Sequence, residues 1–315
     1  MLPLALMLSS SLLASSHAGL SQSAQVPAAP GSQAPVATGS QAPSTDPKLH
    51  EQLSLPVPAN PALPTLWLVG DSTVRNGHGD GANGQWGWGE PLASFFDPAK
   101  INVVNRAIGG RSSRTYITEN QWQTTLDMMK AGDFMLVQFG HNDSGPLDDA
   151  ARARGTLPGV GEDTREIENP ILKRHETVHT YGWYMRQYVQ QARAKGVTVM
   201  VCTLIPRKTW KDGRVVESGP DSYGGWARTI ARQEQVPVID LNQIIARQYD
   251  AMGEAAVEPM FGDPHTHTSL AGAKLNASDV VLGLKLLHPD PLAKYMSAAA
   301  DAVPSTLPAE VLPKP

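Results

Sequence analysis

Short apolar runs that end at glycine or polar residues recur along this chain, and longer segments of helical spacing separate them. The first run is Leu66–Val69, and it ends at Gly70, Asp71 and Ser72. Its four apolar residues are consecutive rather than alternating, which is typical of a strand buried on both faces of a parallel sheet. Ligands bind just past the carboxyl ends of such strands. Ser72 is therefore expected on a turn that borders a site, although a serine there can also simply cap the next helix.

The same alternation continues to about residue 287. Strands are expected at 66–69, 101–105, 134–139, 197–204 and 236–240, and helices at 91–96, 122–131, 171–195, 223–235, 241–252 and 269–287. Residues 144–170 contain several glycines and prolines, and they are expected to form an excursion over the site that is partly helical at 147–153. Alternating strands and helices predict an α/β fold in which a parallel sheet lies between helical layers.

The amino-terminal part of the chain has a different composition. Residues 1–18 are apolar, contain no acid and end in Ser-His-Ala, which is typical of a secretory signal peptide. Residues 19–64 are rich in Ala, Pro, Ser and Gln, and such a segment cannot bury enough apolar surface to offset its ordering entropy. We therefore expect a signal peptide at 1–18, a disordered tail at 19–64, one domain at 65–290, a carboxyl-terminal tail at 291–315, and a secreted or periplasmic location in a bacterium.

Composition narrows the possible partners. The 315-residue chain carries a formal net charge of −4, and no run of basic residues is longer than two, so nucleic acid is not expected as a partner. Beyond the first residues no apolar stretch is long enough to span a bilayer, so no membrane partner is expected after signal cleavage. The single cysteine, Cys202, excludes an internal disulfide bond. The sequence leaves the oligomeric state open.

Polar residues follow other strands in the same way. Gly109 and Gly110 come after the second strand, where glycines allow a backbone N–H to point into a site. Asn142 follows the third strand, and its amide can donate to an oxyanion or form an Asx-turn. Asp263 precedes His267 near the start of the last helix. An acid that orients an imidazole supplies the base that a serine nucleophile needs, so the pattern indicates a serine hydrolase.

Four segments, in order, resemble the sequence blocks of the GDSL or SGNH hydrolases, and in full they look like the rhamnogalacturonan acetylesterase branch of that superfamily. They are Gly-Asp-Ser-Thr-Val-Arg at 70–75, Gly-Arg-Ser-Ser-Arg-Thr-Tyr at 110–116, Gln-Phe-Gly-His-Asn-Asp at 138–143 and His-Thr-His-Thr-Ser-Leu-Ala-Gly-Ala at 265–273. The resemblance covers residues from about 65 to 287.

This resemblance implies a three-layer α/β/α sandwich with a five-stranded, parallel, flavodoxin-like sheet. It implies that Ser72 is the nucleophile and that Asp263 and His267 are the acid and the base. The oxyanion donors that it implies are the N–H groups of Ser72 and Gly110 and the side chain of Asn142. Such an enzyme needs no metal and no cofactor.

The spacing of the acid and the base departs from the family pattern. The family places them three residues apart, whereas Asp263 and His267 are four apart, with Pro264 inserted between the expected positions. His265 lies only two residues after Asp263, which leaves it as an alternative base. The Thr-Ser-Leu-Ala-Gly-Ala string at 268–273 aligns with the family when His267 is the base.

The resemblance implies a secreted esterase that removes acetyl groups from a plant cell-wall polysaccharide, with rhamnogalacturonan as the leading substrate. An acetylesterase for another glycan such as xylan, or a general short-chain esterase, remains an alternative. Arg111 and Arg114 are candidates for binding galacturonate carboxylates, because a guanidinium presents a fork of donors that suits a carboxylate.

Two other patterns compete with this interpretation. His175-Glu-Thr-Val-His179 matches the HExxH motif of zinc proteases, although Met185 occupies the position of the third ligand in one class of them. A non-catalytic sugar-binding module would use exposed tryptophans, for which the candidates are Trp86, Trp88, Trp183 and Trp210. Such a module does not require a serine, an acid and a histidine at strand ends.

Overall fold

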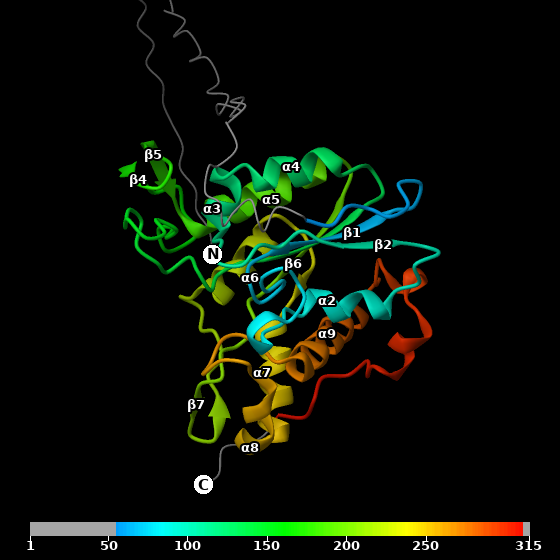
Figure 1. Ribbon diagram of the computed structural model, residues 1–315. Helices are drawn as coiled ribbons and strands as arrows, with labels where there is room; N and C mark the ends of the chain where they lie inside the picture. The colour runs from blue at the N-terminus through cyan, green and yellow to red at the C-terminus, as the bar shows by residue number, and fades with distance from the viewer. Residues whose placement is uncertain (1–54, 311–315) are drawn as a thin grey trace, which may run out of the picture. The chain divides into compact units, whose positions relative to one another are not determined.

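The computed structural model describes residues 55–310 (Figure 1). The expected signal peptide at 1–18, residues 19–54 of the expected tail and residues 311–315 lie outside the described residues. At the centre are five parallel strands in the order β2-β1-β3-β6-β9. Their bounds are β1 Thr65–Gly70, β2 Asn102–Asn105, β3 Phe134–Gln138, β6 Thr198–Cys202 and β9 Val238–Ile239. The five-stranded, parallel α/β fold expected from the sequence is confirmed.

The strand order creates a switch point in the sheet. The chain goes from β1 to β2 at one edge and then returns to place β3 on the other side of β1. Connections after β1 and β3 therefore leave toward different sides, and a crevice forms between them at the carboxyl ends of the strands. The turns that carry Ser72 and Asn142 begin at this crevice.

Consecutive side chains of a strand point to opposite faces of the sheet, and in this fold helices cover both faces. Leu66 and Leu68 of β1 pack with α2, α7 and α9, whereas Trp67 and Val69 pack with α3, α4, α5 and α6 (Figure 1). The helices are α2 Gly89–Leu92, α3 Ser113–Thr118, α4 Gln121–Met128, α5 Tyr181–Ala194, α6 Tyr223–Gln233, α7 Leu241–Met252, α8 Glu254–Val257 and α9 Leu270–Lys285. Short 3-10 turns lie at 82–84, 93–95, 258–260, 293–295 and 298–302.

Several helices begin at a side chain that accepts a hydrogen bond from the first turn. Ser112, Thr180, Ser222, Asp240 and Ser269 cap α3, α5, α6, α7 and α9 respectively. Each cap satisfies a backbone N–H that has no partner within its helix, and it fixes where the loop before the helix must end. Two of these capped starts, those of α3 and α9, directly follow segments of the predicted site.

The expected helix at 171–195 is wrong in its first part. Residues 164–179 form an antiparallel hairpin of β4 Thr164–Asn169 and β5 Arg174–His179, and α5 begins only at Tyr181. In β5, Glu176 and Val178 are buried while their neighbours are more exposed, which is the two-residue period of a strand. Residues 147–153, expected to be partly helical, form turns. The structure also contains a small hairpin of β7 Trp210–Lys211 and β8 Arg214–Val215.

The domain extends beyond the expected limits of 65 and 290. Leu55 is buried in the hydrophobic core, and Asn102 forms hydrogen bonds with the backbone of Asn60. Toward the carboxyl terminus, Leu292 and Ala300 are buried in the core that includes α7 and α9. Residues 55–64 and 291–310 are therefore parts of the domain rather than tails. Within residues 55–310, no helix is both long enough and apolar enough to cross a bilayer.

Candidate active site

A cavity of about 600 Å³ opens at the carboxyl ends of β1, β2 and β3. The turns after these strands contribute Ser72, Gly110 and Asn142 to its wall, and His267 comes from the segment before α9. These residues are distant in the sequence, and the switch point of the sheet brings them to one edge. The four predicted segments therefore converge on one cavity.

Ser72, His267 and Asp263 form a continuous chain of hydrogen bonds. The Oγ of Ser72 lies 2.8 Å from the Nε2 of His267, and the Nδ1 of His267 lies 2.5 Å from a carboxylate oxygen of Asp263. An ionised carboxylate can only accept, so Nδ1 carries the ring proton and Nε2 is left with a lone pair toward the serine hydroxyl. This is the tautomer in which an imidazole can take a proton from a serine.

The segment around Asp263 accommodates the inserted proline. The other carboxylate oxygen of Asp263 accepts hydrogen bonds from the backbone N–H groups of His265, Thr266 and His267 at 2.9, 2.6 and 3.0 Å. The chain thus curls around the carboxylate, so that the residue four positions later, rather than three, returns to it. Of the two histidines, it is His267 that meets Ser72 and Asp263, while the ring of His265 contacts Thr266 and Arg207.

The same contacts keep Asp263 ionised. Partial burial raises the pKa of the Asp263 carboxyl, but the hydrogen bonds from Thr266, His267 and His265 outweigh this effect and hold the pKa at about 2. Hydrogen bonds to the charged form of a carboxyl stabilise that form. Asp263 therefore remains a carboxylate at any pH at which the imidazole can act as a base.

Hydrogen-bond donors lie beside the Ser72 hydroxyl. Among residues 55–310, the backbone N–H groups of Ser72 and Gly110 have no acceptor. Gly110 has a φ of +78°, which favours glycine, and a Cβ on Gly109 would lie 3.5 Å from that of Ser72, so this turn passes close to the serine. Asn142 gives one amide hydrogen to the carbonyl of Arg111 at 2.9 Å and keeps a second for the cavity. Three donors are thus available to an oxyanion.

Buried polar groups support this edge of the sheet from below. Asp143 accepts hydrogen bonds from the backbone N–H and the hydroxyl of Ser113 at 3.0 and 2.5 Å, which ties the turn after β3 to the start of α3. Burial raises the pKa of Asp143 to about 7. Burial likewise lowers the pKa of the neighbouring His141 to about 4, so its imidazole is neutral near pH 7. The sequence analysis did not single out either residue.

The two arginines proposed for substrate binding have different surroundings. Arg111 lies on the cavity wall, where its guanidinium forms an ion pair with Glu119 at 2.8 Å. Arg114 is fully buried, and two of its nitrogens each lie 2.7 Å from an oxygen of Glu176. It also donates to the carbonyls of Leu147 and Gly155. The expectation that Arg114 contacts substrate is wrong, because Arg114 is fully buried, does not line the cavity and has four of its five N–H groups engaged by Glu176, Leu147 and Gly155.

Three other arginines, which the sequence analysis missed, lie on the cavity wall. Arg152 and Arg154 belong to the segment between β3 and β4, and Arg207 follows β6. Their sequence signal was weak, because Arg152 and Arg154 stand in an irregular segment and Arg207 is far from the resembling blocks. The Ala-Arg-Ala-Arg string at 151–154, which contains no acid, was the one local indication.

The zinc-protease alternative does not fit the geometry. Its motif forms the strand β5 rather than a helix, and residues four apart in a strand are separated by about 13 Å, too far to share one metal ion. Glu176, the base in that motif, is bound to Arg114. Within residues 55–310, no three His, Cys, Asp or Glu side chains are grouped so that they could hold a metal.

The tryptophans considered as a sugar platform do not form one. Trp88 is buried, and its indole N–H donates to Gln138. Trp210 packs against the core near α7, and Trp183 stacks on His179 with ring centroids 3.8 Å apart. Trp86 is half-buried, and its backbone pairs with Thr268. None of the four lines the cavity.

A parallel α/β sheet with a hydrogen-bonded serine, imidazole and carboxylate at its carboxyl edge is an arrangement that serine hydrolases use. A family model described as the GDSL-like lipase/acylhydrolase family matches residues 68–275. The chain therefore belongs to this family and is a carboxylic ester hydrolase.

Known relatives are similar over most of this domain. A rhamnogalacturonan acetylesterase of Emericella nidulans is 32% identical over 68% of this chain and 81% of its own length. A probable rhamnogalacturonan acetylesterase, YesY of Bacillus subtilis, is 33% identical over 70% of this chain and 93% of its own length. The crystal structure of YxiM from Bacillus subtilis superposes with a TM-score of 0.56 at 25% identity, covering 71% of this chain and 56% of that one.

Proposed function

We propose that this chain is a secreted acetylesterase that removes acetyl groups from a plant cell-wall polysaccharide, with rhamnogalacturonan as its leading substrate. The observation that carries the proposal is the 2.8 Å contact between the Ser72 Oγ and the His267 Nε2, with Asp263 on the far side of the imidazole. The names of the two relatives above support the substrate, because one is a rhamnogalacturonan acetylesterase and the other is named as a probable one.

In this mechanism, Ser72 attacks the carbonyl carbon of the acetyl ester while His267 takes the proton of its hydroxyl. Asp263 stabilises the imidazolium that forms. The negative oxygen accepts hydrogen bonds from the N–H groups of Ser72 and Gly110 and from the Asn142 amide. Each such donor contributes roughly a hundredfold or more to the rate.

The intermediate then collapses, and His267 returns its proton to the sugar oxygen as the ester C–O bond breaks. The deacetylated sugar leaves, and the acetyl group remains on Ser72. Water attacks this acyl-enzyme with His267 again acting as the base, which releases acetate and restores the serine. Every proton moves between the imidazole and an oxygen, so the cycle requires no group from outside the protein other than water.

We further propose that residues 1–18 direct the chain out of the cell, as their apolar, acid-free composition supports. An intact polysaccharide of the plant cell wall is found outside the bacterial cytoplasm, so export would bring the enzyme to this substrate. Sequencing the amino terminus of the mature protein recovered from the medium or the periplasm tests this point, because cleavage near residue 18 is expected.

The test of the activity is acetate release from acetylated rhamnogalacturonan, acetylated xylan and 4-nitrophenyl acetate, each with the wild-type enzyme and with Ser72→Ala. We expect the highest kcat/KM on rhamnogalacturonan and loss of all three activities in Ser72→Ala. A clear preference for xylan would replace the substrate but keep the mechanism. Hydrolysis only of 4-nitrophenyl acetate would indicate a general short-chain esterase, and full activity of Ser72→Ala would overturn the mechanism.

A further inference from the structure

The wall of the cavity carries an excess of positive charge. Among the lining residues within 55–310, four are arginines and Glu119 is the one acidic residue. The arginines are Arg111, Arg152, Arg154 and Arg207. Glu119 is engaged by Arg111 at 2.8 Å. Within residues 55–310, no carboxylate forms an ion pair with any of the other three.

Arg152 and Arg154 are two cations placed next to each other. Arg152 is exposed and has no hydrogen-bond partner among the residues that the structure describes. Burial lowers the pKa of Arg154, and the positive charge of Arg152 lowers it further, while Asp143 and Asp149 act in the opposite direction. Like charges so close are unfavourable by themselves, and a bound anion would remove the cost.

Arg154 also touches the oxyanion turn. Its guanidinium donates to the carbonyl of Gly110 at 3.1 Å, which leaves its other N–H groups for the cavity. The anion site therefore adjoins the place where the ester carbonyl would lie. Arg207 donates to Thr266 and to the carbonyl of His141, beside the segment that carries His267.

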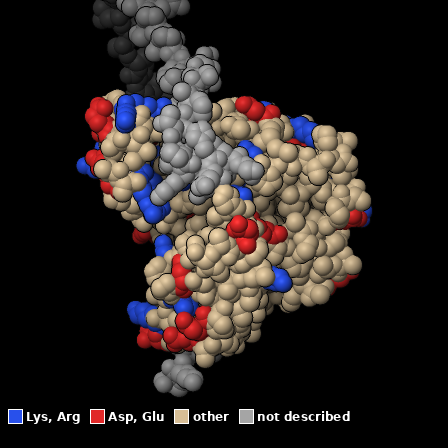
Figure 2. Space-filling view, in the orientation of Figure 1, with Lys and Arg blue, Asp and Glu red and all other residues tan. Residues whose placement is uncertain are grey.

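This charge pattern differs from that of the rest of the molecule. The whole chain has a formal net charge of −4. On the face in Figure 2, basic and acidic side chains are interspersed. Several arginines away from the cavity are paired, for example Arg228 with Asp240 and Arg186 with Glu162. A concave wall with three guanidinium groups that form no ion pair within residues 55–310 is therefore a local feature, of the kind that attracts an anionic ligand.

We propose that Arg152 and Arg154, with Arg207 completing the positive wall, bind a carboxylate of the polysaccharide near the acetylated sugar. The inference rests on the proposed esterase function and makes its substrate class specific. The enzyme selects acetyl esters on uronate-containing chains over those on neutral glycans, because a carboxylate can accept hydrogen bonds from two guanidinium groups at once. Arg152 is the residue that this role explains best, because within residues 55–310 it forms no hydrogen bond and no ion pair.

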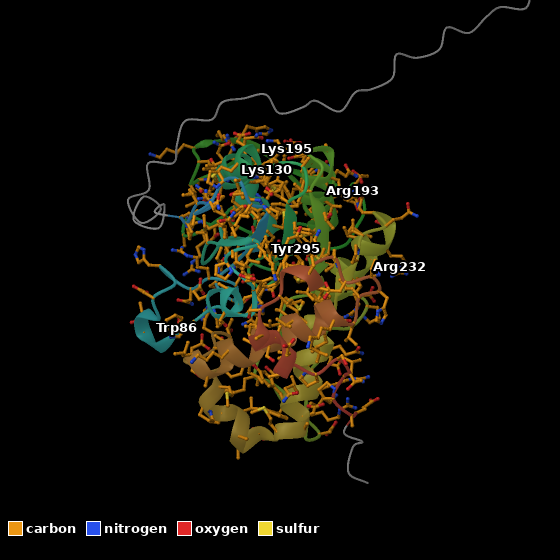
Figure 3. All side chains as sticks on the ribbon, turned by 90° about the vertical axis from the view of Figure 1, so that its right-hand side faces the viewer. Trp86, Lys130, Arg193, Lys195, Arg232 and Tyr295 are labelled. Carbon is orange, nitrogen blue, oxygen red and sulfur yellow. The ribbon has the colours of Figure 1, made fainter. Side chains whose placement is uncertain are left out.

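The experiment compares one acetylated, uronate-containing oligosaccharide in two forms, with free carboxylates and with the carboxyls converted to methyl esters. Released acetate is measured, so loss of methanol is not counted. The enzymes are the wild type, Arg152→Gln and the matched control Arg232→Gln. Arg232 lies on α6, is exposed at the surface (Figure 3) and is not among the residues that line the cavity.

For the wild type we expect kcat/KM to be about tenfold or more higher on the carboxylate form than on the methyl-esterified form, since a hydrogen bond to a charged group contributes that much or more. In Arg152→Gln this ratio should fall toward one, mainly through KM, and Arg232→Gln should keep the wild-type ratio. Raising the ionic strength to about 0.5 M should lower the ratio in the wild type, because salt screens charges at an open site.

Equal rates of acetate release from the two forms by the wild type would overturn the inference, and so would an unchanged ratio in Arg152→Gln. Neither result would affect the esterase proposal, which is read from hydrolysis of 4-nitrophenyl acetate and its loss in Ser72→Ala. If the folded wild-type protein does not hydrolyse 4-nitrophenyl acetate, the proposed function is wrong. The inference about selectivity, which rests on that function, is then wrong as well.

Discussion

The cavity has two walls that are constructed in different ways. One, the strand-end wall, consists of the turns that carry Ser72, Gly110 and Asn142 together with residues 263–267. The other, the hairpin wall, is the segment 144–180, which contains β4 and β5. In the strand-end wall, the acid is held by its own segment, because Asp263 accepts hydrogen bonds from backbone N–H groups two to four residues further along the chain. In the hairpin wall, a single buried ion pair, Arg114 with Glu176, spans 62 residues of sequence.

The difference between the two walls corresponds to two tasks, the chemical reaction and the recognition of the substrate. Proton transfer requires heavy atoms within about 3 Å of one another, and short-range backbone contacts at the ends of rigid strands can hold that geometry. Recognition of a long polymer does not require such exact placement of atoms. A wall formed by a large insertion can therefore serve this purpose. Arg114, which we had expected to contact substrate, instead acts as the anchor of that insertion.

The largest effect is expected in the strand-end wall, from Asp263→Asn. The neutral amide can no longer stabilise the imidazolium or fix its tautomer, so kcat should fall by roughly 10³–10⁴. Steady-state hydrolysis of 4-nitrophenyl acetate measures it. The matched control is His265→Gln, which changes the nearby histidine that does not contact Ser72 and should retain most of the activity. A severe loss in the control together with an active Asp263→Asn would reverse our assignment of acid and base.

The next effect is expected in the hairpin wall, from Glu176→Gln. This change leaves the guanidinium of Arg114 buried without a counter-charge, which should lower the free energy of unfolding by about 3–5 kcal/mol. Urea denaturation measures it. Glu166→Gln in the same hairpin is the control, because its ion pair with His175 is exposed to solvent. Equal stability of the two variants would show that the ion pair does not anchor this wall.

A smaller effect is expected where the two walls meet, at Asp143. Its pKa is about 7 in the folded protein and close to 4 when unfolded, so the folded state binds more protons between these values. Stability should therefore fall as the pH rises from 4 to 7, with a contribution on the order of 2–4 kcal/mol. In Asp143→Asn this part of the pH dependence should vanish, because the amide resembles the protonated carboxyl. Unfolding curves at several pH values measure it, and an unchanged profile would refute the role of Asp143.

The smallest effect is expected from His175→Ala at the outer surface of the hairpin wall. Its imidazole contacts Glu166 and Glu168 in solvent, so the variant should match the wild type in activity and stability. A chelator should likewise leave activity unchanged. Loss of hydrolysis in the variant, or on chelation, would revive the zinc-protease alternative.

The same comparison shows what the sequence could predict. The strand-end wall was predictable because apolar runs that end in polar residues follow from the geometry of a buried parallel sheet, as with Leu66–Val69 and Ser72. The sequence favours His267 as the base but does not exclude His265, because the choice depends on three N–H groups that converge on one oxygen of Asp263. That curl is a tertiary feature with no pattern of its own.

The hairpin wall was mostly missed for a physical reason. Residues 171–179 are polar enough that helical and strand periods both fit them, and the features of the strand are its pairing with β4 and the burial of Glu176 and Val178 on one face. Likewise, nothing local distinguishes the buried Arg114 from Arg152 on the cavity wall. Which arginine pairs with an acid is decided by contacts between distant segments.

The most direct test of the account is covalent labelling of the proposed nucleophile. The folded enzyme is treated with an organophosphate that reacts with activated serines, and the modified residue is located by peptide mass spectrometry. We predict one adduct, on Ser72, which is lost in His267→Ala because the hydroxyl then has no base to activate it. An enzyme that hydrolyses acetyl esters while Ser72 remains unlabelled, or equal labelling in His267→Ala, would contradict the account.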